Sequence, residues 1–396
     1  MSQKDQQHDR TVLVIGAGAS GRGHVGQLAA ESGYRLVFLD KDQGLCSALR
    51  TAGRYAVRLV GAPTRTVTVE GFTILHTSEE QAVAESLRDA CLIFTTVCPG
   101  NLREVADLLR PHLVRWLGQS RPDEFKNVLC CENMNRSSTT FRGMLLEGFP
   151  ADLARRLDLQ VGFADTMIAR VVARPSDPLA LLGEEYSEWT ADRTAFRGPV
   201  LPSIRTLDLV DDQARYLQRK LYIHNTGHAT FGYLGFLRGY TWIHEAAQDP
   251  LIMEACRGAI EESGWAIQKE YGFPEEVIQA YRAALTDKCV SPELPDEILR
   301  VVREPMRKLG SEERFFGPIG LMLRHGRQPE RLLEGVCAAL LCRIPGDGQS
   351  ERIAALLQEQ GVTCLEKVVG MALAPGLLSR IQLLLPVVKK RFSRQP

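Results

Sequence analysis

The sequence predicts an α/β protein in which an open, parallel-rich sheet forms the first half and α-helices form most of the second. Between residues 11 and 131, short runs of β-branched and aromatic residues alternate with helical segments, which is typical of βαβ units with right-handed crossovers. Beyond residue 198 the apolar residues repeat with a helical period and strand-like runs become rare. We therefore predict a flexible tail over residues 1–10, an α/β domain over 11–198 and a mainly helical domain over 199–396.

Individual elements follow from local patterns. The Thr- and Val-rich segment 55–75 predicts antiparallel strands. In the second half, Pro305, Pro318 and Pro345 are expected to separate helices, because proline lacks the N–H that an interior helical residue donates. The strands expected in the parallel sheet cover residues 11–15, 35–39, 90–97 and 127–131, and the clearest helical patterns cover 214–236, 251–271 and 329–341.

Composition excludes several classes of protein. The 396 residues include 48 Lys and Arg against 48 Asp and Glu, and zero net charge disfavours a nucleic-acid partner, since binding phosphates needs an excess of cations. The longest apolar stretch, near residues 368–378, is too short for a bilayer, and the polar start of the chain lacks the apolar core of a signal peptide. Ten cysteines without a CxxC pair indicate reduced thiols in the core, so we expect a cytoplasmic protein with no membrane partner.

A glycine-rich turn follows the first strand. Gly16 permits a tight turn, Gly18 lets the backbone approach a pyrophosphate, and Gly21 allows the next helix to pack closely on the strand. Asp40 ends the second strand 19 residues after Gly21, where a carboxylate accepts hydrogen bonds from the adenosine ribose. These features predict a Rossmann-type domain that binds NAD. A tight turn without a ligand is the alternative, and Lys41 beside Asp40 keeps NADP open.

The carboxyl ends of later strands should face the nicotinamide, because in this fold the cofactor lies across the carboxyl ends of the strands. Those ends read TTVCPGN and CCENMNR, and they add Thr96, Val97, Pro99, Glu132 and Asn133 as candidates. The residues expected to bind the cofactor are Gly16, Ala17, Gly18, Ala19, Ser20, Gly21, Arg22, Asp40, Lys41, Thr96, Val97, Pro99 and Asn133.

A polar cluster interrupts an otherwise apolar helix in the second half. At about 100° per residue, Lys220, His224, Asn225 and His228 share one side of a helix. This set suits a dehydrogenase of secondary alcohols, in which a lysine of lowered pKa takes the hydroxyl proton and amides such as Asn225 and Asn133 stabilise the alkoxide. In the structural alternative, Lys220 extends to solvent and His228 packs.

The two histidines also raise the possibility of a metal. His224 and His228 stand four residues apart, as zinc ligands do, but the sequence HNTGH lacks the glutamate of HExxH. We therefore expect no metal site.

With these motifs in place, the chain resembles the polyol-specific long-chain dehydrogenases, most closely the members that act on mannitol 1-phosphate. The Lys-x4-Asn-x2-His pattern is the most characteristic feature, and the resemblance covers nearly the whole chain after the tail. Ala19-Ser20, Ala169 and Tyr240 depart from the usual pattern. The matching segments are GAGASGRGHVGQL (16–28), TTVCPGNL (95–102), CENM (131–134), VGFADTMIAR (161–170), EEYSEW (184–189), KLYIHNTGHA (220–229), YLG (233–235), EESGWAIQKEYGF (261–273) and REPMRKLGSEER (303–314).

The resemblance implies a zinc-independent, NAD-dependent interconversion of mannitol 1-phosphate and fructose 6-phosphate. It implies that Lys220 is the general base of oxidation, that Asn225 and Asn133 form the oxyanion pocket, and that His228 binds substrate hydroxyls. Glu132 looks like the family's acidic residue near the proton path; simple solvation at a strand end is the alternative. An unphosphorylated polyol, a hexonate of the mannonate or altronate type, and a non-catalytic dinucleotide sensor stay open as other functions.

A phosphorylated substrate needs cations. Arg303, Arg307 and Lys308 lie in a basic segment, and we expect at least one of them to contact the phosphate, because guanidinium and ammonium groups bind phosphate oxygens. The alternative is that these charges pair with the neighbouring glutamates on a helix surface. We expect a small-molecule sugar phosphate or polyol as the partner, and a monomer or homodimer.

Overall fold

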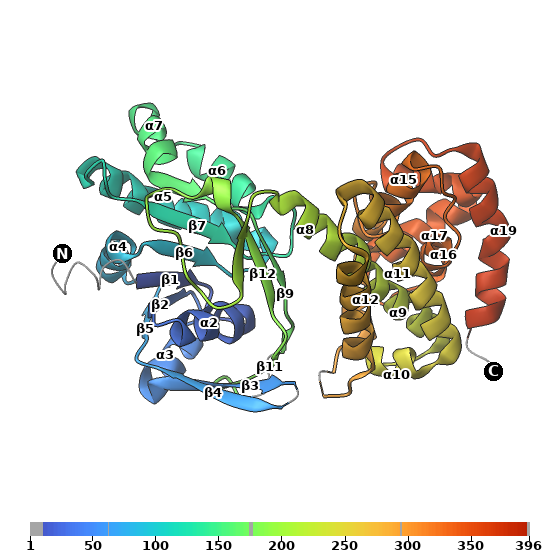
Figure 1. Ribbon diagram of the computed structural model, residues 1–396, viewed down its shortest axis with the longest axis horizontal. Coiled ribbons are helices and arrows are strands. Elements are labelled where there is room, and N and C mark those ends of the chain that lie inside the picture. The colour runs from blue at the N-terminus through green and yellow to red at the C-terminus, as the bar shows by residue number, and fades with distance from the viewer. Residues whose placement is uncertain (1–10, 62, 174–176, 294, 394–396) are drawn as a thin grey trace. The chain divides into compact units, whose positions relative to one another are not determined.

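The computed structural model describes residues 11–61, 63–173, 177–293 and 295–393 (Figure 1). The chain forms two compact units, Met1–Leu217 and Gln218–Pro396. The division lies inside helix α8 (Gln213–Arg219), later than the boundary predicted after residue 198. The first unit extends further because strand β13 (Leu207–Val210) pairs with β12 (Glu188–Asp192), so the chain returns to a sheet after Pro202. The predicted tail over residues 1–10 lies outside the described residues.

Six parallel strands form the central sheet of the first unit. The four strands predicted from β-branched runs are confirmed as its four inner strands, and two shorter strands complete its edges. The sequence therefore predicts the centre of the sheet and misses its edges. In spatial order the strands are β5 (Thr73–His76), β2 (Arg35–Asp40), β1 (Thr11–Ile15), β6 (Leu92–Thr95), β7 (Lys126–Cys130) and β8 (Val161–Phe163).

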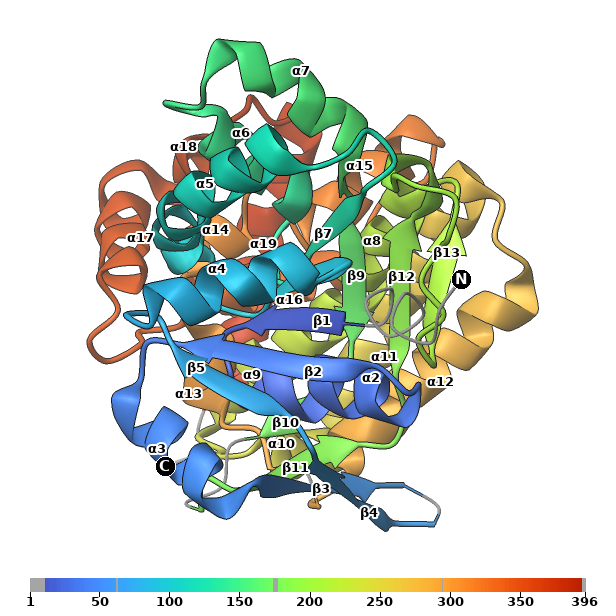
Figure 2. The same cartoon turned by 90° about the vertical axis from the view of Figure 1, so that its left-hand side faces the viewer.

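Both faces of this sheet are covered, which explains why every residue of β1 is buried. Val12 and Val14 pack into a core with α2 and α3, whereas Leu13 and Ile15 point to the opposite face and pack with α4, α5 and α6. Figure 2 shows these two helix layers on either side of the sheet. The helical segments of the first unit are η1 (Gly21–Gly26), α2 (Gln27–Glu31), α3 (Gln43–Ala52), α4 (Glu80–Asp89), η2 (Pro99–Asn101), α5 (Leu102–Gln119), α6 (Ser137–Leu146), α7 (Ala151–Gln160) and η3 (Arg193–Ala195).

Two smaller sheets complete the first unit. The antiparallel strands predicted over residues 55–75 are confirmed for β3 and β4, but β5 at the end of that segment runs parallel to β2. The strands after residue 160 were not predicted, because most are short and only partly buried, so their period is weak. The smaller sheets contain β3 (Arg54–Val60), β4 (Arg65–Glu70), β10 (Val172–Ala173) and β11 (Ala180–Glu184) in one, and β9 (Thr166–Ala169), β12 and β13 in the other.

Strand β7 begins with a buried lysine. Lys126 is 2% exposed, and its Nζ donates to the carbonyl oxygens of Arg88 at 2.9 Å and Ala90 at 2.7 Å. The Nζ also lies 4.5 Å from the centre of the Trp116 ring. Burial lowers the pKa of Lys126 to about 7. The unfolded chain, with a lysine pKa of about 10.4, therefore binds the proton more tightly than the folded chain does.

This difference predicts a pH-dependent effect of Lys126→Met. Between about pH 9 and pH 7, Lys126 is protonated in the unfolded wild type but largely neutral in the folded protein, so each step down in pH favours unfolding. The variant has no amine to protonate and does not lose stability in this way. The free energy of unfolding of the variant, relative to wild type, should therefore rise by about 1.4 kcal/mol for each pH unit lowered across this range. Urea unfolding of both proteins at both pH values measures it. A difference that does not change with pH would contradict the assignment.

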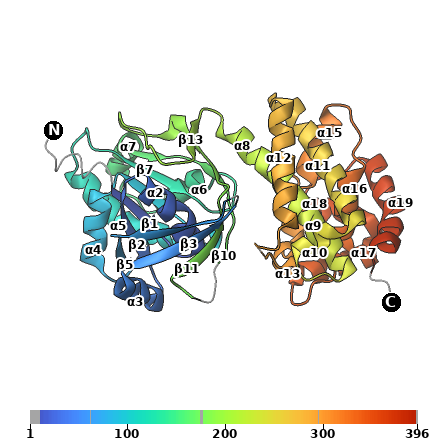
Figure 3. The same cartoon turned by 60° about the horizontal axis from the view of Figure 1, so that its bottom comes forward.

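The second unit is built from helices, as the sequence predicts. Helix α9 packs against α11, α13 and α16, and Figure 3 shows α11 next to α12. None of the helices among the described residues combines the length and apolar character needed to cross a membrane. The helical segments are η4 (Lys220–His224), α9 (Asn225–Arg238), α10 (Ile243–Gln248), α11 (Pro250–Tyr271), α12 (Glu275–Val290), α13 (Ile298–Val302), α14 (Pro305–Lys308), α15 (Phe316–Arg324), α16 (Arg331–Leu341), α17 (Gly348–Gln360), η5 (Gly361–Cys364), α18 (Leu365–Val369) and α19 (Pro375–Phe392).

The predicted proline breaks hold in two of three places. Pro305 begins α14, and Pro345 lies between α16 and α17. Pro318 was expected to separate helices, and that prediction is wrong, because it lies in the first turn of α15. The first turn tolerates proline since its N–H groups have no helical acceptor.

Candidate functional site

The glycine turn after β1 is tightly enclosed at two of its glycines. Gly16 has φ +96°, and a Cβ there would lie 2.8 Å from the Thr96 carbonyl oxygen. A Cβ on Gly21 would lie 1.9 Å from the Gly16 carbonyl oxygen. The hydroxyl of Thr96 donates to that same oxygen at 2.6 Å. Only glycine fits at these two positions, which gives the turn the shape that a dinucleotide-binding loop requires.

Asp40 reaches from the end of β2 to the glycine turn. Its Oδ2 accepts from the Ala17 N–H at 2.6 Å, and its Oδ1 accepts from the Asp42 N–H at 2.9 Å. The half-buried carboxylate keeps lone pairs for further donors, so the position fits an acceptor for ribose hydroxyls. Lys41 points elsewhere and pairs with Glu104 at 2.7 Å on the surface.

Arg22 supports the turn from within the protein. It is 1% exposed, and its Nε donates to the Ala17 carbonyl oxygen at 2.6 Å while its guanidinium also hydrogen-bonds the Pro178 carbonyl. The side chain of Arg22, expected to bind the cofactor, is thus enclosed by protein. Gly18 and Ala19 are half-buried and Ser20 is exposed, so these residues form the accessible part of the turn.

The helix that follows the glycine turn is not a regular α-helix from its start. It begins as the π-helix η1 and becomes α-helical only from Gln27. A π-helix closes i→i+5 hydrogen bonds and holds one more residue in the turn than an α-helix would, and such turns often occur at functional sites.

The carboxyl ends of β6 and β7 are joined by one carboxylate. Glu132 is 6% exposed, and it accepts from the Thr95 hydroxyl at 2.7 Å and from the Val97 N–H at 2.9 Å. Burial raises the pKa of Glu132 above its ordinary value, against the opposing effect of these hydrogen bonds. Asn133, the next residue, is exposed, and Pro99 begins the short helix η2 beyond Val97.

The polar cluster of the second unit lies where a helix changes its winding. Residues Lys220–His224 form the π-helix η4 between α8 and α9. The arrangement calculated at 100° per residue is therefore wrong across this turn, because a π-helix rotates less per residue. Lys220 begins the π turn and Asn225 begins α9; both are half-buried.

His228 is held by a carboxylate that sequence reasoning missed. Its Nε2 lies 2.9 Å from Oδ2 of Asp296, and Arg300 donates to the same carboxylate at 2.6 and 2.8 Å. Burial lowers the pKa of His228, although Asp296 opposes the shift. Burial raises the pKa of Asp296, but the hydrogen bonds and charges of His228 and Arg300 outweigh it and lower that pKa to about 2. His228 is thus a neutral imidazole that donates through Nε2, and its Nδ1 is the acceptor.

A second lysine joins the cluster from α12. Lys288 Nζ lies 3.3 Å from Nε2 of His224, and the rings of His224 and His228 are 6.1 Å apart. Burial, followed by the charges of Lys288, His228 and Lys220, holds the pKa of His224 well below its ordinary value. No local motif pointed to Lys288 or Asp296, because both lie more than 60 residues along the chain from the histidine that they contact.

The three candidate phosphate ligands have different surroundings. Arg307 pairs with Glu304 at 2.8 Å and Glu313 at 3.4 Å, as the surface alternative predicted. Lys308 is 6% exposed and its Nζ donates to the Val301 carbonyl; burial, then the nearby Arg314 and Arg307, lower its pKa to about 7. Arg303 is exposed at the end of α13.

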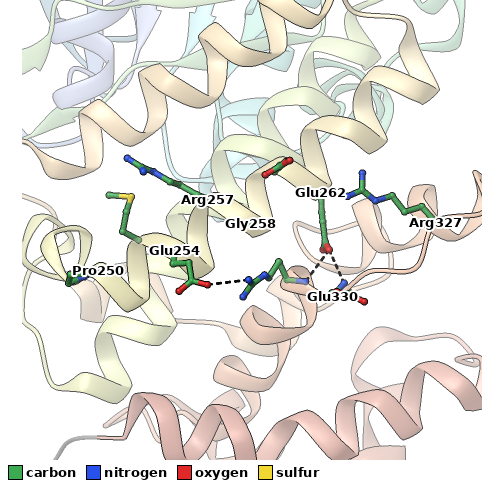
Figure 4. Close-up of a pocket in the computed structure, with 10 residues that line it drawn as sticks. Pro250, Glu254, Arg257, Gly258, Glu262, Arg327 and Glu330 are labelled. Carbon is green, nitrogen blue, oxygen red and sulfur yellow. Dashed lines mark hydrogen bonds and ion pairs between the residues drawn. The ribbon is translucent and has the colours of Figure 1, made fainter.

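A pocket of about 630 Å³ opens on the second unit between α11 and the start of α16, away from the residues of the polar cluster. Figure 4 shows Glu262 directed at the backbone of Glu330, whose N–H donates to it at 2.9 Å. Arg331 and Leu332 also donate their N–H groups to Glu262, so this carboxylate caps α16. The described residues contain no group of three or more His, Cys, Asp and Glu side chains placed to hold a metal ion.

Comparison with known proteins gives two family matches in chain order. The model described as "Mannitol dehydrogenase Rossmann domain" matches residues 10–203, and "Mannitol dehydrogenase C-terminal domain" matches residues 212–370. These ranges cover both the glycine turn and the polar cluster.

Two solved structures share the fold. The Pseudomonas fluorescens mannitol 2-dehydrogenase, solved as a ternary complex with NAD and D-mannitol, is 17% identical with a TM-score of 0.75, over 97% of this chain and 92% of that one. A D-sorbitol dehydrogenase in substrate-free form is 14% identical with a TM-score of 0.80, over 96% and 93%. With both of its domains matched in order, the chain belongs to the mannitol dehydrogenase family of polyol dehydrogenases.

Proposed function

We propose that the protein is an NAD-dependent dehydrogenase that interconverts mannitol 1-phosphate and fructose 6-phosphate, as mannitol-1-phosphate 5-dehydrogenase does. The observation that carries the proposal is the polar cluster of the second unit, in which Lys220, Asn225 and His228 begin or follow a π turn and His228 is fixed by a half-buried carboxylate. Taking polar groups partly out of water is costly unless they form hydrogen bonds, and substrate hydroxyls can supply such bonds. The family match and the enclosed glycine turn support NAD as the cofactor.

The chemistry divides among the chain's own residues. Bound NAD supplies the hydride acceptor. Lys220 takes the proton of the substrate's C5 hydroxyl during oxidation and returns it during reduction. The amides of Asn225 and Asn133 donate to the oxygen as it becomes an alkoxide, without titrating themselves. His228 accepts a hydrogen bond from a substrate hydroxyl at Nδ1.

The tautomer of His228 gives a testable consequence. The carboxylate of Asp296 fixes the proton on Nε2, whereas an amide in its place can either accept from or donate to that nitrogen. Asp296→Asn should therefore lower kcat/KM for the polyol by about 10- to 100-fold, the scale for losing a histidine's carboxylate partner. Initial rates with NAD measure it, and NADH affinity should be unchanged. If the variant keeps the wild-type kcat/KM, Asp296 is not needed to fix the tautomer of His228.

A substrate comparison tests the function itself. The oxidation of NADH and of NADPH is followed by absorbance with fructose 6-phosphate, fructose and hexuronates as acceptors. The proposal expects NADH and fructose 6-phosphate to give the highest kcat/KM. Preference for fructose would indicate an unphosphorylated polyol, and preference for a hexuronate would indicate a hexonate dehydrogenase. Tight NADH binding without any turnover would indicate a sensor.

The same assay tests the phosphate ligands. We propose that at least one of Arg303, Arg307 and Lys308 contacts the phosphate, and reversing the charge of all three should raise KM for fructose 6-phosphate. An unchanged KM, in a variant that folds and binds NADH, removes these residues from the site.

A further inference from the structure

One buried carboxylate accounts for how the ends of two strands are held together. Glu132 follows β7, yet both of its oxygens accept hydrogen bonds from the end of β6 and the residues just after it: the Thr95 hydroxyl at 2.7 Å and the Val97 N–H at 2.9 Å. The main chain adds a third link, because the Cys131 N–H donates to the Thr95 carbonyl at 2.9 Å. The two strand ends therefore cannot shift against each other without breaking all three hydrogen bonds.

The same segment reaches the glycine turn in the opposite direction. Thr96, between the two partners of Glu132, donates its hydroxyl to the Gly16 carbonyl oxygen at 2.6 Å, and its N–H donates to the Ile15 carbonyl at 2.8 Å. Thr95 and Thr96 thus face opposite ways along one strand end, as neighbouring residues of a strand do. Through them the glycine turn, the end of β6 and the residue before Asn133 form one continuous hydrogen-bonded bracket.

This geometry conflicts with a proton-carrying role for Glu132. A proton carrier has to present an oxygen to the substrate or to water, but Glu132 is 6% exposed and each of its oxygens accepts from a fixed protein donor. Its neighbour Asn133 is exposed instead.

We propose that Glu132 is a positioning residue, whose carboxylate sets the register of the β6 and β7 ends and so fixes Asn133 relative to the cofactor turn. The inference rests on the proposed function, which makes Asn133 an oxyanion donor. A donor displaced by about 1 Å costs on the order of 10²-fold in rate, so a residue that never touches substrate can control turnover.

Two substitutions separate positioning from proton transfer. In Glu132→Gln the amide oxygen still accepts from the Val97 N–H and the NH₂ group can donate to the Thr95 hydroxyl, so the bracket survives without an ionisable group. In Glu132→Ala both donors lose their acceptor. We expect Glu132→Gln to keep kcat within about 3-fold of wild type with the same pH profile of kcat/KM, and Glu132→Ala to lose on the order of 10²-fold in kcat.

Thr95→Val and Glu147→Ala complete the set. Thr95→Val removes one of the two side-chain links and should give an intermediate loss, also without a change in the pH profile. Glu147→Ala removes an exposed carboxylate that pairs with Arg103, and it should behave as wild type. Loss of activity in Glu132→Gln comparable to the alanine variant, or loss of an ionisation from its pH profile, would overturn the proposal in favour of a proton carrier. Wild-type kcat in a folded Glu132→Ala would overturn it as well.

A binding assay keeps this test independent of the proposed substrate. If no polyol is turned over by wild type, the proposed function fails, but NADH titrations of the same variants still report on the bracket. Glu132→Ala should then weaken NADH binding through the glycine turn, and Glu132→Gln should restore it. Equal NADH affinity in both variants and in wild type would show that Glu132 does not hold the glycine turn in place.

Discussion

Lys220→Ala should lower kcat by roughly 10²-fold or more while leaving NADH affinity nearly unchanged. Lys220 is the first residue of the π turn, and its charge is close enough to lower the pKa of His224. As the proposed base, it is needed only when the substrate hydroxyl loses its proton, so the loss should fall on kcat and on kcat/KM together. Steady-state rates and fluorescence titration with NADH measure the two effects separately.

A chemical rescue distinguishes a missing base from a distorted site. A small primary amine added to the Lys220→Ala enzyme should restore part of the lost rate in a concentration-dependent way, because it supplies the missing proton acceptor. Lys269→Ala, at an exposed lysine on α11, serves as the matched control and should show wild-type rates. Retained turnover in the Lys220 variant would refute the proposed mechanism.

Gly21→Ala should abolish tight NADH binding, with a loss of about 10²-fold or more, equivalent to about 2.7 kcal/mol. The added methyl group would lie 1.9 Å from the Gly16 carbonyl oxygen and 2.6 Å from the Thr96 hydroxyl. The carbonyl belongs to the backbone of the turn itself, so the clash can be relieved only by opening the turn. NADH titration of the purified variant measures the effect.

Gly118→Ala provides the control for this substitution. Gly118 lies in α5, and a Cβ there would meet no atom within 4 Å. Gly118 is the next-to-last residue of α5, where an added methyl group has space, so this variant should be as stable as wild type with unchanged NADH affinity. Equal NADH affinity of the Gly21 variant and wild type would show that the cofactor binds elsewhere.

The centre of the fold could be predicted because it depends on local patterns. The run TVLVI is buried on both faces, and Gly16 and Gly21, which follow it, have no room for a Cβ. The small sheets were harder to predict. Strand β10, for example, has only two residues, both half-buried, and is too short to show an alternation of buried and exposed residues. The domain boundary was placed early because Gly198-Pro199 looks like a linker, whereas β13 returns to the first unit after it.

The site shows a similar division. Lys220, Asn225 and His228 stand out in sequence because polar residues interrupt an apolar helix. Their relative orientation could not be predicted, since a hydrophobic period of 3.6 carries no signal for a π turn. Asp296 and Lys288 were missed because their partners are brought near only by the packing of separate helices. Glu132 was chosen for its neighbourhood to Asn133, but the hydrogen bonds that define its role come from another strand.

The π turn at Lys220–His224 lets this segment hold one residue more than an α-helix between the same two ends would. Deleting one residue inside the turn would therefore let the helix return to ordinary α winding while α9 keeps nearly its present orientation. Such a deletion would remove one side chain of the turn and leave His228 close to Asp296. In the divergence of such enzymes, this turn is thus a place where a residue can be gained or lost without repacking the helices on either side.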